Sequence, residues 1–139
     1  MSTNGFIIFV ADGESKSSYS HYDSGPGDLG VKVVAWLGQR TSTPTRARAL
    51  YEDIKRLKVV SDDVGPPPTD AQREEFARYF DDSVAGGEWY GLLRATQGEP
   101  EMIFECGYTV DECCARVSRG RRSWRRKKPG NRHTLRARI

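Results

Sequence analysis

The chain has 139 residues, of which 37% are hydrophobic and 29% are charged. This length fits one domain with its own core better than two independent domains, and the low apolar content predicts that part of the chain lies outside that core. No apolar run approaches the roughly 20 residues that a membrane-spanning helix needs, and the first residues lack the features of a signal peptide. We therefore expect a cytoplasmic protein without a membrane partner.

Charge divides the chain near residue 115. Residues 116–139 contain eleven Arg or Lys and no acid, whereas residues 1–115 hold the other eleven cations and all nineteen acids, so the two parts carry net charges of +11 and −8. An acidic body with a basic tail favours a polyanionic partner or contact between the two parts. We expect residues 1–115 to form an α+β globular domain and residues 116–139 to be a basic tail that is disordered when unbound.

The first predicted elements form a hairpin that leads into a helix. Phe6 to Ala11 (FIIFVA) is typical of a buried strand, and Asp12-Gly13 predicts a turn. The following KSSYSHYDS alternates, which predicts a return strand with Tyr19, His21 and Asp23 on one face. From residue 28, apolar residues recur at helical spacing until Gly38.

Helix-start signals recur in the middle of the chain. Thr43-Pro44 and the capping box Thr69 to Gln72 each predict the first turn of a helix. Residues 88–96 and 101–106 indicate a second hairpin around residues 97–100, with a helical first arm as the alternative. The fold expected from these elements is α+β, with a small antiparallel sheet of about four strands packed on two or three helices and a basic C-terminal extension.

The stretch YSHYDSGPGDLG, residues 19–30, gathers side chains that a binding site would use. The structural interpretation is a turn with glycines and a proline before a helix; the functional one is a loop that binds a phosphate or moves a proton. We assign ligand binding to Tyr19, His21, Asp23 and Arg94, and the catalytic alternative to His21, Asp23 and Ser24. The spacing matches no P-loop, dinucleotide fingerprint or nucleophile elbow, so no cofactor is expected.

This stretch and the later WYGLLRATQG, residues 89–98, resemble two motifs of a family of small proteins from actinobacterial phages. The resemblance runs from residue 5 to about residue 110 and implies a phage setting and an α+β domain, with no activity that carries over. Gly25, where the family has Tyr before Pro, and Asp28, in place of a small residue, depart from the pattern and put a shared pocket at this loop in doubt.

The cysteines predict neither a disulfide framework nor a metal site. Cys106, Cys113 and Cys114 are an odd number, and two of them are adjacent, which is awkward geometry for chelation. A zinc site built from Cys106, one of the adjacent pair and His133 is the alternative to plain reduced thiols, and we favour the thiols.

The tail gives the strongest indication of a partner. Its arginines and lysines suit nucleic-acid phosphates, and Trp124 suits stacking on an exposed base. The residues assigned to RNA or DNA binding are Arg119, Arg121, Arg122, Trp124, Arg125, Arg126, Lys127, Lys128 and Arg132. Because related chains continue differently after about Glu112, a replaced or frame-shifted end is the alternative interpretation.

The function predicted from the sequence is therefore that of a small, non-enzymatic, phage-type protein that binds nucleic acid in the cytoplasm of a bacterial host. The first alternative is a host-interaction factor that binds and modulates a bacterial protein through its globular surface. The second is a small-ligand binder or an enzyme that uses the loop at residues 19–30.

Overall fold

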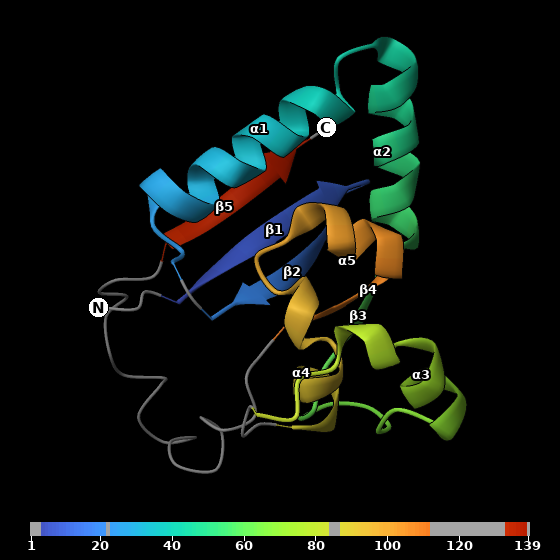
Figure 1. Cartoon of the computed structure of the whole chain (residues 1–139). Coiled ribbons are helices and arrows are strands. Elements are labelled where there is room, and N and C mark those ends of the chain that lie inside the picture. Colours follow the sequence, from blue (N-terminus) through green and yellow to red (C-terminus); the bar gives the residue numbers. More distant parts are fainter. Residues whose placement is uncertain (1–3, 22, 84–86, 112–132, 139) are drawn as a thin grey trace.

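A computed structural model describes residues 4–21, 23–83, 87–111 and 133–138 (Figure 1). Of residues 133–138 only the backbone is described. The strands are β1 (Gly5–Ala11), β2 (Glu14–Ser20), β3 (Lys58–Val60), β4 (Tyr108–Val110) and β5 (His133–Arg138). The helices are α1 (Val31–Arg40), α2 (Pro44–Arg56), α3 (Asp70–Glu75), α4 (Glu88–Leu92) and α5 (Pro100–Cys106), with the short turns η1 (Pro26–Gly30), η2 (Ala77–Tyr79) and η3 (Arg94–Thr96).

The predicted mixture of helices and strands is confirmed, as is the N-terminal hairpin. β1 pairs with β2 in antiparallel register from Gly5 opposite Ser20 to Ala11 opposite Glu14. The turn between them places Asp12 at φ 52° and Gly13 at φ 75°, conformations that Asp and Gly tolerate better than most residues. The predicted starts of α2 and α3 are also confirmed, because Thr43 and Thr69 each accept a hydrogen bond from a main-chain amide of the first turn.

The sheets differ from the expected antiparallel one. A three-stranded sheet has the order β2-β1-β5, in which β5 runs parallel to β1, and β3 and β4 form a separate parallel pair. The predicted second hairpin does not form. Its first arm consists of α4 and η3, which confirms the helical alternative, and its second arm is α5, with a turn at residues 97–99 between them. Pro100 at the first position of α5 and Gly107, left-handed at its C-cap, are the start and stop signals of a helix.

The predicted domain boundary at residue 115 does not coincide with the end of the fold. The backbone of β5 pairs with β1 from Gly5 opposite His133 to Val10 opposite Arg138. Leu135 and Ala137 occupy the register positions of the buried Ile7 and Phe9, so the alternation HTLRAR suits an edge strand despite its cations. The rest of the expected tail, residues 116–132, lies outside the described residues.

The core consists of packed clusters on either side of β2. In the main cluster, Ile7 and Phe9 of β1 meet α1, α2 and α5, with Trp36, Leu50 and Ile103 among the buried contacts. The second cluster joins η2, α4 and β4, and its buried residues are Phe76, Tyr79, Trp89, Leu92, Leu93 and Val110. Trp89, the first residue of the WYGLLRATQG motif, is 3% exposed and is therefore a core residue.

Two buried polar contacts attach β2 to both sides of the molecule. The Lys16 ammonium donates hydrogen bonds to the carbonyl oxygens of Lys55 and Leu57 at 2.6 and 2.8 Å, at the C-terminal end of α2. Ser18 lies two residues after Lys16 in β2, and its hydroxyl oxygen accepts a hydrogen bond from the Thr109 hydroxyl of β4 at 2.6 Å. A cation is favourable at a helix C-terminus, where main-chain carbonyls lack helical partners.

We predict that Lys16→Met lowers the free energy of unfolding by about 2 kcal/mol, because it keeps the apolar stem but leaves two carbonyls without their charged donor. Arg48→Met, at an exposed position of α2, is the matched control and is expected to change stability by less than about 0.5 kcal/mol. Urea unfolding of both variants measures the difference. Equal stability of the two would show that the Lys16 contact contributes nothing.

Candidate functional site

Three of the predicted ligand-binding residues, Tyr19, His21 and Arg94, come together around Tyr90, which the predicted set did not include. The Tyr19 hydroxyl lies 3.3 Å from Nδ1 of His21, and the His21 ring meets the Tyr90 ring edge-on at 6.3 Å between centroids. The Arg94 guanidinium lies over the Tyr90 ring, 5.7 Å from its centroid. Tyr90 is 1% exposed, so it is a buried platform that places Arg94 on the same side of the molecule as His21.

The catalytic alternative gains no support from the loop geometry. Ser24 is completely buried, and its hydroxyl donates to the Ser20 carbonyl at 3.3 Å, so no substrate reaches it. β2 ends at Ser20, and Asp23 turns to φ 47° with an exposed side chain, so His21 and Asp23 do not continue a strand face as expected. This part of the motif is a turn in which the Asp23 carbonyl accepts a hydrogen bond from the Leu29 amide.

A pocket of about 450 Å³, here called the polar groove, lies beside this platform. One wall comes from the end of β2, the following loop and the start of α1, and the other from η3 and the start of α5. The first wall contributes Ser20, Asp23, Asp28, Leu29 and Lys32, and the second contributes Arg94, Gln97, Gly98 and Glu99. An ion pair between Lys32 and Glu99, 2.5 Å between nitrogen and oxygen, joins the two walls.

Arg94 is held in place by its neighbours on the second wall. In addition to lying over Tyr90, its Nη1 donates to Oε1 of Gln97 at 2.9 Å. The Gln97 Nε2 is buried and has no acceptor among the described residues. Hydrogen bonds from Ser83, with a smaller contribution from the positive charge of Arg94, lower the pKa of Asp81, so the field of Arg94 also reaches that carboxylate.

Gly98, the last residue of the TQG motif, sets how closely the two walls approach. It has φ +73°, and a Cβ at this position would lie 2.8 Å from Oγ of Ser20. A side chain here would be strained and would meet β2, so a glycine is needed. The glycine of the TQG sequence was the one signal that could have predicted a close approach of residues 94–99 to the end of β2. Nothing in the sequence indicated that Asp28, Lys32 and Gln97 would line the same groove.

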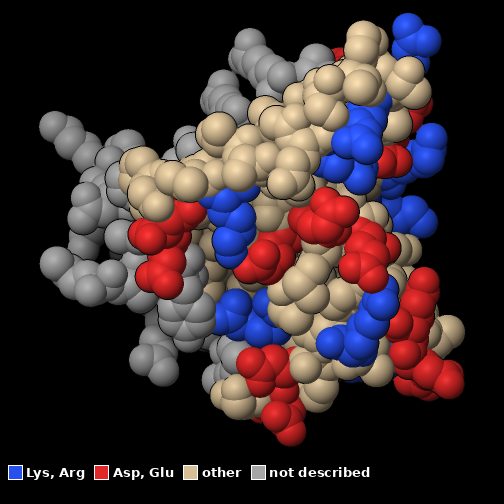
Figure 2. Space-filling model, turned by 45° about the horizontal axis from the view of Figure 1, so that its top comes forward, with Lys and Arg blue, Asp and Glu red and all other residues tan. Residues whose placement is uncertain are grey.

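The surface around the groove is mixed in charge. Figure 2 shows acidic and basic side chains interspersed next to a long uncharged stretch that α1 presents to solvent. On that stretch Val31 and Val34 are 61% and 69% exposed. The groove is therefore flanked by charged groups of both signs and by one apolar helix face.

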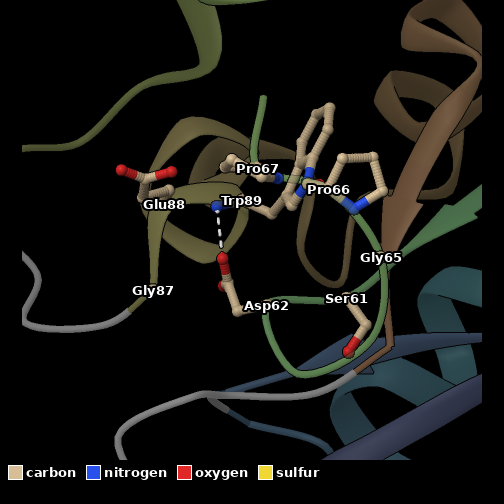
Figure 3. A pocket seen from close by; sticks show the side chains of 8 residues that line it. All are labelled: Ser61, Asp62, Gly65, Pro66, Pro67, Gly87, Glu88 and Trp89. Atoms are coloured by element: carbon tan, nitrogen blue, oxygen red, sulfur yellow. Dashed lines mark hydrogen bonds between the residues drawn. The ribbon is translucent and has the colours of Figure 1, made fainter. Parts of the chain in front are cut away.

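A second, smaller pocket of about 250 Å³ lies where α4 begins (Figure 3). Its central carboxylate, Asp62, accepts hydrogen bonds from the main-chain amides of Trp89 and Tyr90 at 2.8 and 3.0 Å. The Trp89 indole donates to the Pro66 carbonyl at 3.0 Å. These polar groups are engaged within the protein, and we assign them a structural role as the cap of α4.

The alternative zinc site cannot be assembled from the residues that are described. No group of three metal-ligating side chains occurs among them. Cys113 and Cys114 lie outside the described residues, and Cys106 is a partly buried thiol whose pKa burial raises to about 11. No helix in the described part of the chain is long and apolar enough to span a membrane.

Comparison of the chain with protein-family models, with curated proteins and with solved structures found no match. The resemblance of the two motifs to the phage family stays a prediction. The candidate site is therefore defined by its own geometry, as a polar groove beside an aromatic platform.

We predict that Gly87→Ala lowers the free energy of unfolding by about 2 to 3 kcal/mol. A Cβ at Gly87 would lie 2.0 Å from Oδ2 of Asp62, so the carboxylate that caps α4 must move and lose its two amide donors. Gly38→Ala is the control, because its Cβ meets nothing within 4 Å and its helical position favours alanine. A scanning-calorimetry result in which both variants are equally stable would contradict the capping role.

A carboxylate at the end of β4 gives a prediction on pH. Burial raises the pKa of Asp111, and its Oδ1 has no hydrogen-bond partner among the described residues. A raised pKa means that the folded state holds the proton more tightly, so this group favours folding below its unfolded pKa and loses that contribution as pH rises through the folded value. Asp111→Asn should therefore gain stability relative to the parent protein as pH rises from about 3 to 7. Urea midpoints measured across this range test it, and a constant difference would contradict it.

Proposed function

We propose that this protein binds RNA or DNA through the basic segment, defined here as residues 116–132, with the cations of β5 beside it. The single observation that carries the proposal is the charge of residues 116–139, which contain eleven Arg or Lys and no acid. Binding of such a segment to phosphates releases condensed counterions, which makes the affinity high at low salt and steeply dependent on salt. Trp124, among these cations, suits stacking on an unpaired base.

The order of the strands supports nucleic-acid binding by a segment that is attached at both ends. β4 precedes the basic segment and pairs with β3, while β5 follows it and pairs with β1. The segment is thus joined to the body at both ends. A chain joined at both ends has fewer conformations to lose on binding than a free tail of the same length.

The negative charge of residues 1–115 supports binding of nucleic acid through the basic segment rather than through the rest of the protein. Residues 1–115 carry a net charge of −8, so the body repels phosphates that are not held by the cations. In this proposal the body limits non-specific binding, and the basic segment supplies the affinity.

The experiment compares the full chain with a variant in which residues 119–128 are replaced by a Gly/Ser linker of equal length. This design keeps β5, which a truncation after residue 115 would remove from the sheet. Labelled single-stranded RNA and duplex DNA are titrated at several salt concentrations. The parent protein should lose affinity with a log-log slope of roughly −0.7 to −0.9 per phosphate contacted, and the linker variant should lose most of that slope.

A matched control removes cations from the body instead. Arg46→Gln with Arg48→Gln, both exposed on α2, should leave the slope and the affinity nearly unchanged. An affinity in the linker variant equal to that of the parent protein would overturn the proposal, as would binding by the parent protein that does not depend on salt.

A further inference from the structure

The two walls of the polar groove carry opposite net charges once the ion pair that joins them is set aside. Asp23 and Asp28 leave two negative charges on the first wall, and neither forms an ion pair with another described residue. Arg94 adds one positive charge to the second wall, where Tyr90 and Gln97 hold its guanidinium. A complementary ligand has two cationic groups and one anionic group.

Size and polarity restrict the ligand further. The volume of about 450 Å³ lies within the range of small-molecule sites. Among the described residues that line the groove, eight of nine are polar, charged or glycine and Leu29 is the one large apolar side chain, so these residues offer a ligand hydrogen bonds and charge more than apolar contact. A ligand with only negative charge would be repelled by the carboxylates of the first wall. An apolar ligand would leave the polar groups of both walls without hydrogen-bond partners.

We propose that the polar groove binds a small basic amino acid, with its two cationic groups toward Asp23 and Asp28 and its carboxylate toward Arg94. This proposal uses none of the residues assigned to nucleic-acid binding and does not depend on that proposal. Arg94 contributes because a guanidinium fixed by an aromatic ring and an amide is already oriented for a carboxylate, which lowers the entropy lost on binding. The Lys32 and Glu99 pair connects the two walls.

The test titrates the full chain with free L-arginine and follows main-chain amide signals by NMR. Saturable shifts are expected at Asp28, Leu29 and Gly98, with a Kd on the order of 1 mM for a ligand of this size. Agmatine, which lacks the carboxylate, and citrulline, which lacks the side-chain charge, should each bind about tenfold more weakly.

Three substitutions connect these differences to individual residues. Asp28→Asn should weaken arginine about tenfold, because a charged partner is lost while the side chain, which is exposed, keeps its size. Arg94→Gln should remove the preference for arginine over agmatine. Asp63→Asn, which removes an exposed carboxylate outside the groove, is the control and should leave both affinities unchanged.

Several outcomes would overturn the proposal. These are the absence of saturable shifts up to about 10 mM arginine, binding of L-glutamate as tight as that of L-arginine, and an equal effect of Asp63→Asn and Asp28→Asn. Persistence of the arginine preference over agmatine in Arg94→Gln, in a variant whose amide spectrum shows an intact fold, would overturn the assigned role of the guanidinium. Loss of nucleic-acid binding in the linker variant has no bearing on these results, so the two proposals fail separately.

Discussion

The contact on which the arrangement of this protein depends is the Lys16 ammonium bound to the last carbonyls of α2. It ties a strand of the N-terminal hairpin to the end of a helix about 40 residues later in the chain, and it satisfies carbonyls that no helical amide reaches. Since Ser18, two residues further along β2, meets Thr109 of β4, one strand joins the three-stranded sheet, α2 and the second sheet. β2 is thereby held on both sides, close to its end at Ser20.

The polar groove is a consequence of that fixed strand end. Ser20 closes β2, the chain turns through Asp23 and η1, and α1 begins with Lys32 in its first turn. The opposite wall approaches Ser20 at Gly98, where the absence of a side chain leaves room for the Ser20 hydroxyl. The ion pair between Lys32 and Glu99 connects the two walls. An exposed ion pair contributes little stability. The closeness of the two walls therefore depends more on the packing of Gly98 against Ser20 than on this pair.

The sequence predicted those elements whose signals are local, and missed those that depend on distant partners. The Asp12-Gly13 turn and the helix starts at Thr43 and Thr69 each follow from the chemistry of a few adjacent residues, and all three are confirmed. The parallel pairs β1 with β5 and β3 with β4 join segments far apart in the chain, and no local pattern specifies them. In the site, His21 and Arg94 were predicted as members of one ligand-binding set, but the buried ring of Tyr90 that contacts both was not, because no local pattern indicates which side chains meet across the fold. Short helices such as α4 and α5 are ambiguous for the same reason that short strands are: five to seven residues contain too few repeats to distinguish a period of 3.6 from a period of 2.

If both proposals hold, the opposite charges of the groove and the basic segment keep two kinds of ligand apart. A polyanion would be drawn to the cations of residues 116–132 and repelled by the groove, whose described lining side chains carry a net charge of −1. A small cation would be attracted by the groove and repelled by the basic segment. Salt acts on the two interactions unequally. The affinity of a polyanion falls with each counterion that is released, so contacts to several phosphates give a steep dependence on salt. A small ligand at the exposed Asp23 and Asp28 is also screened, but it forms few charged contacts, so its dependence on salt should be weaker. The balance between the two proposed activities therefore depends on ionic strength as well as on ligand concentration.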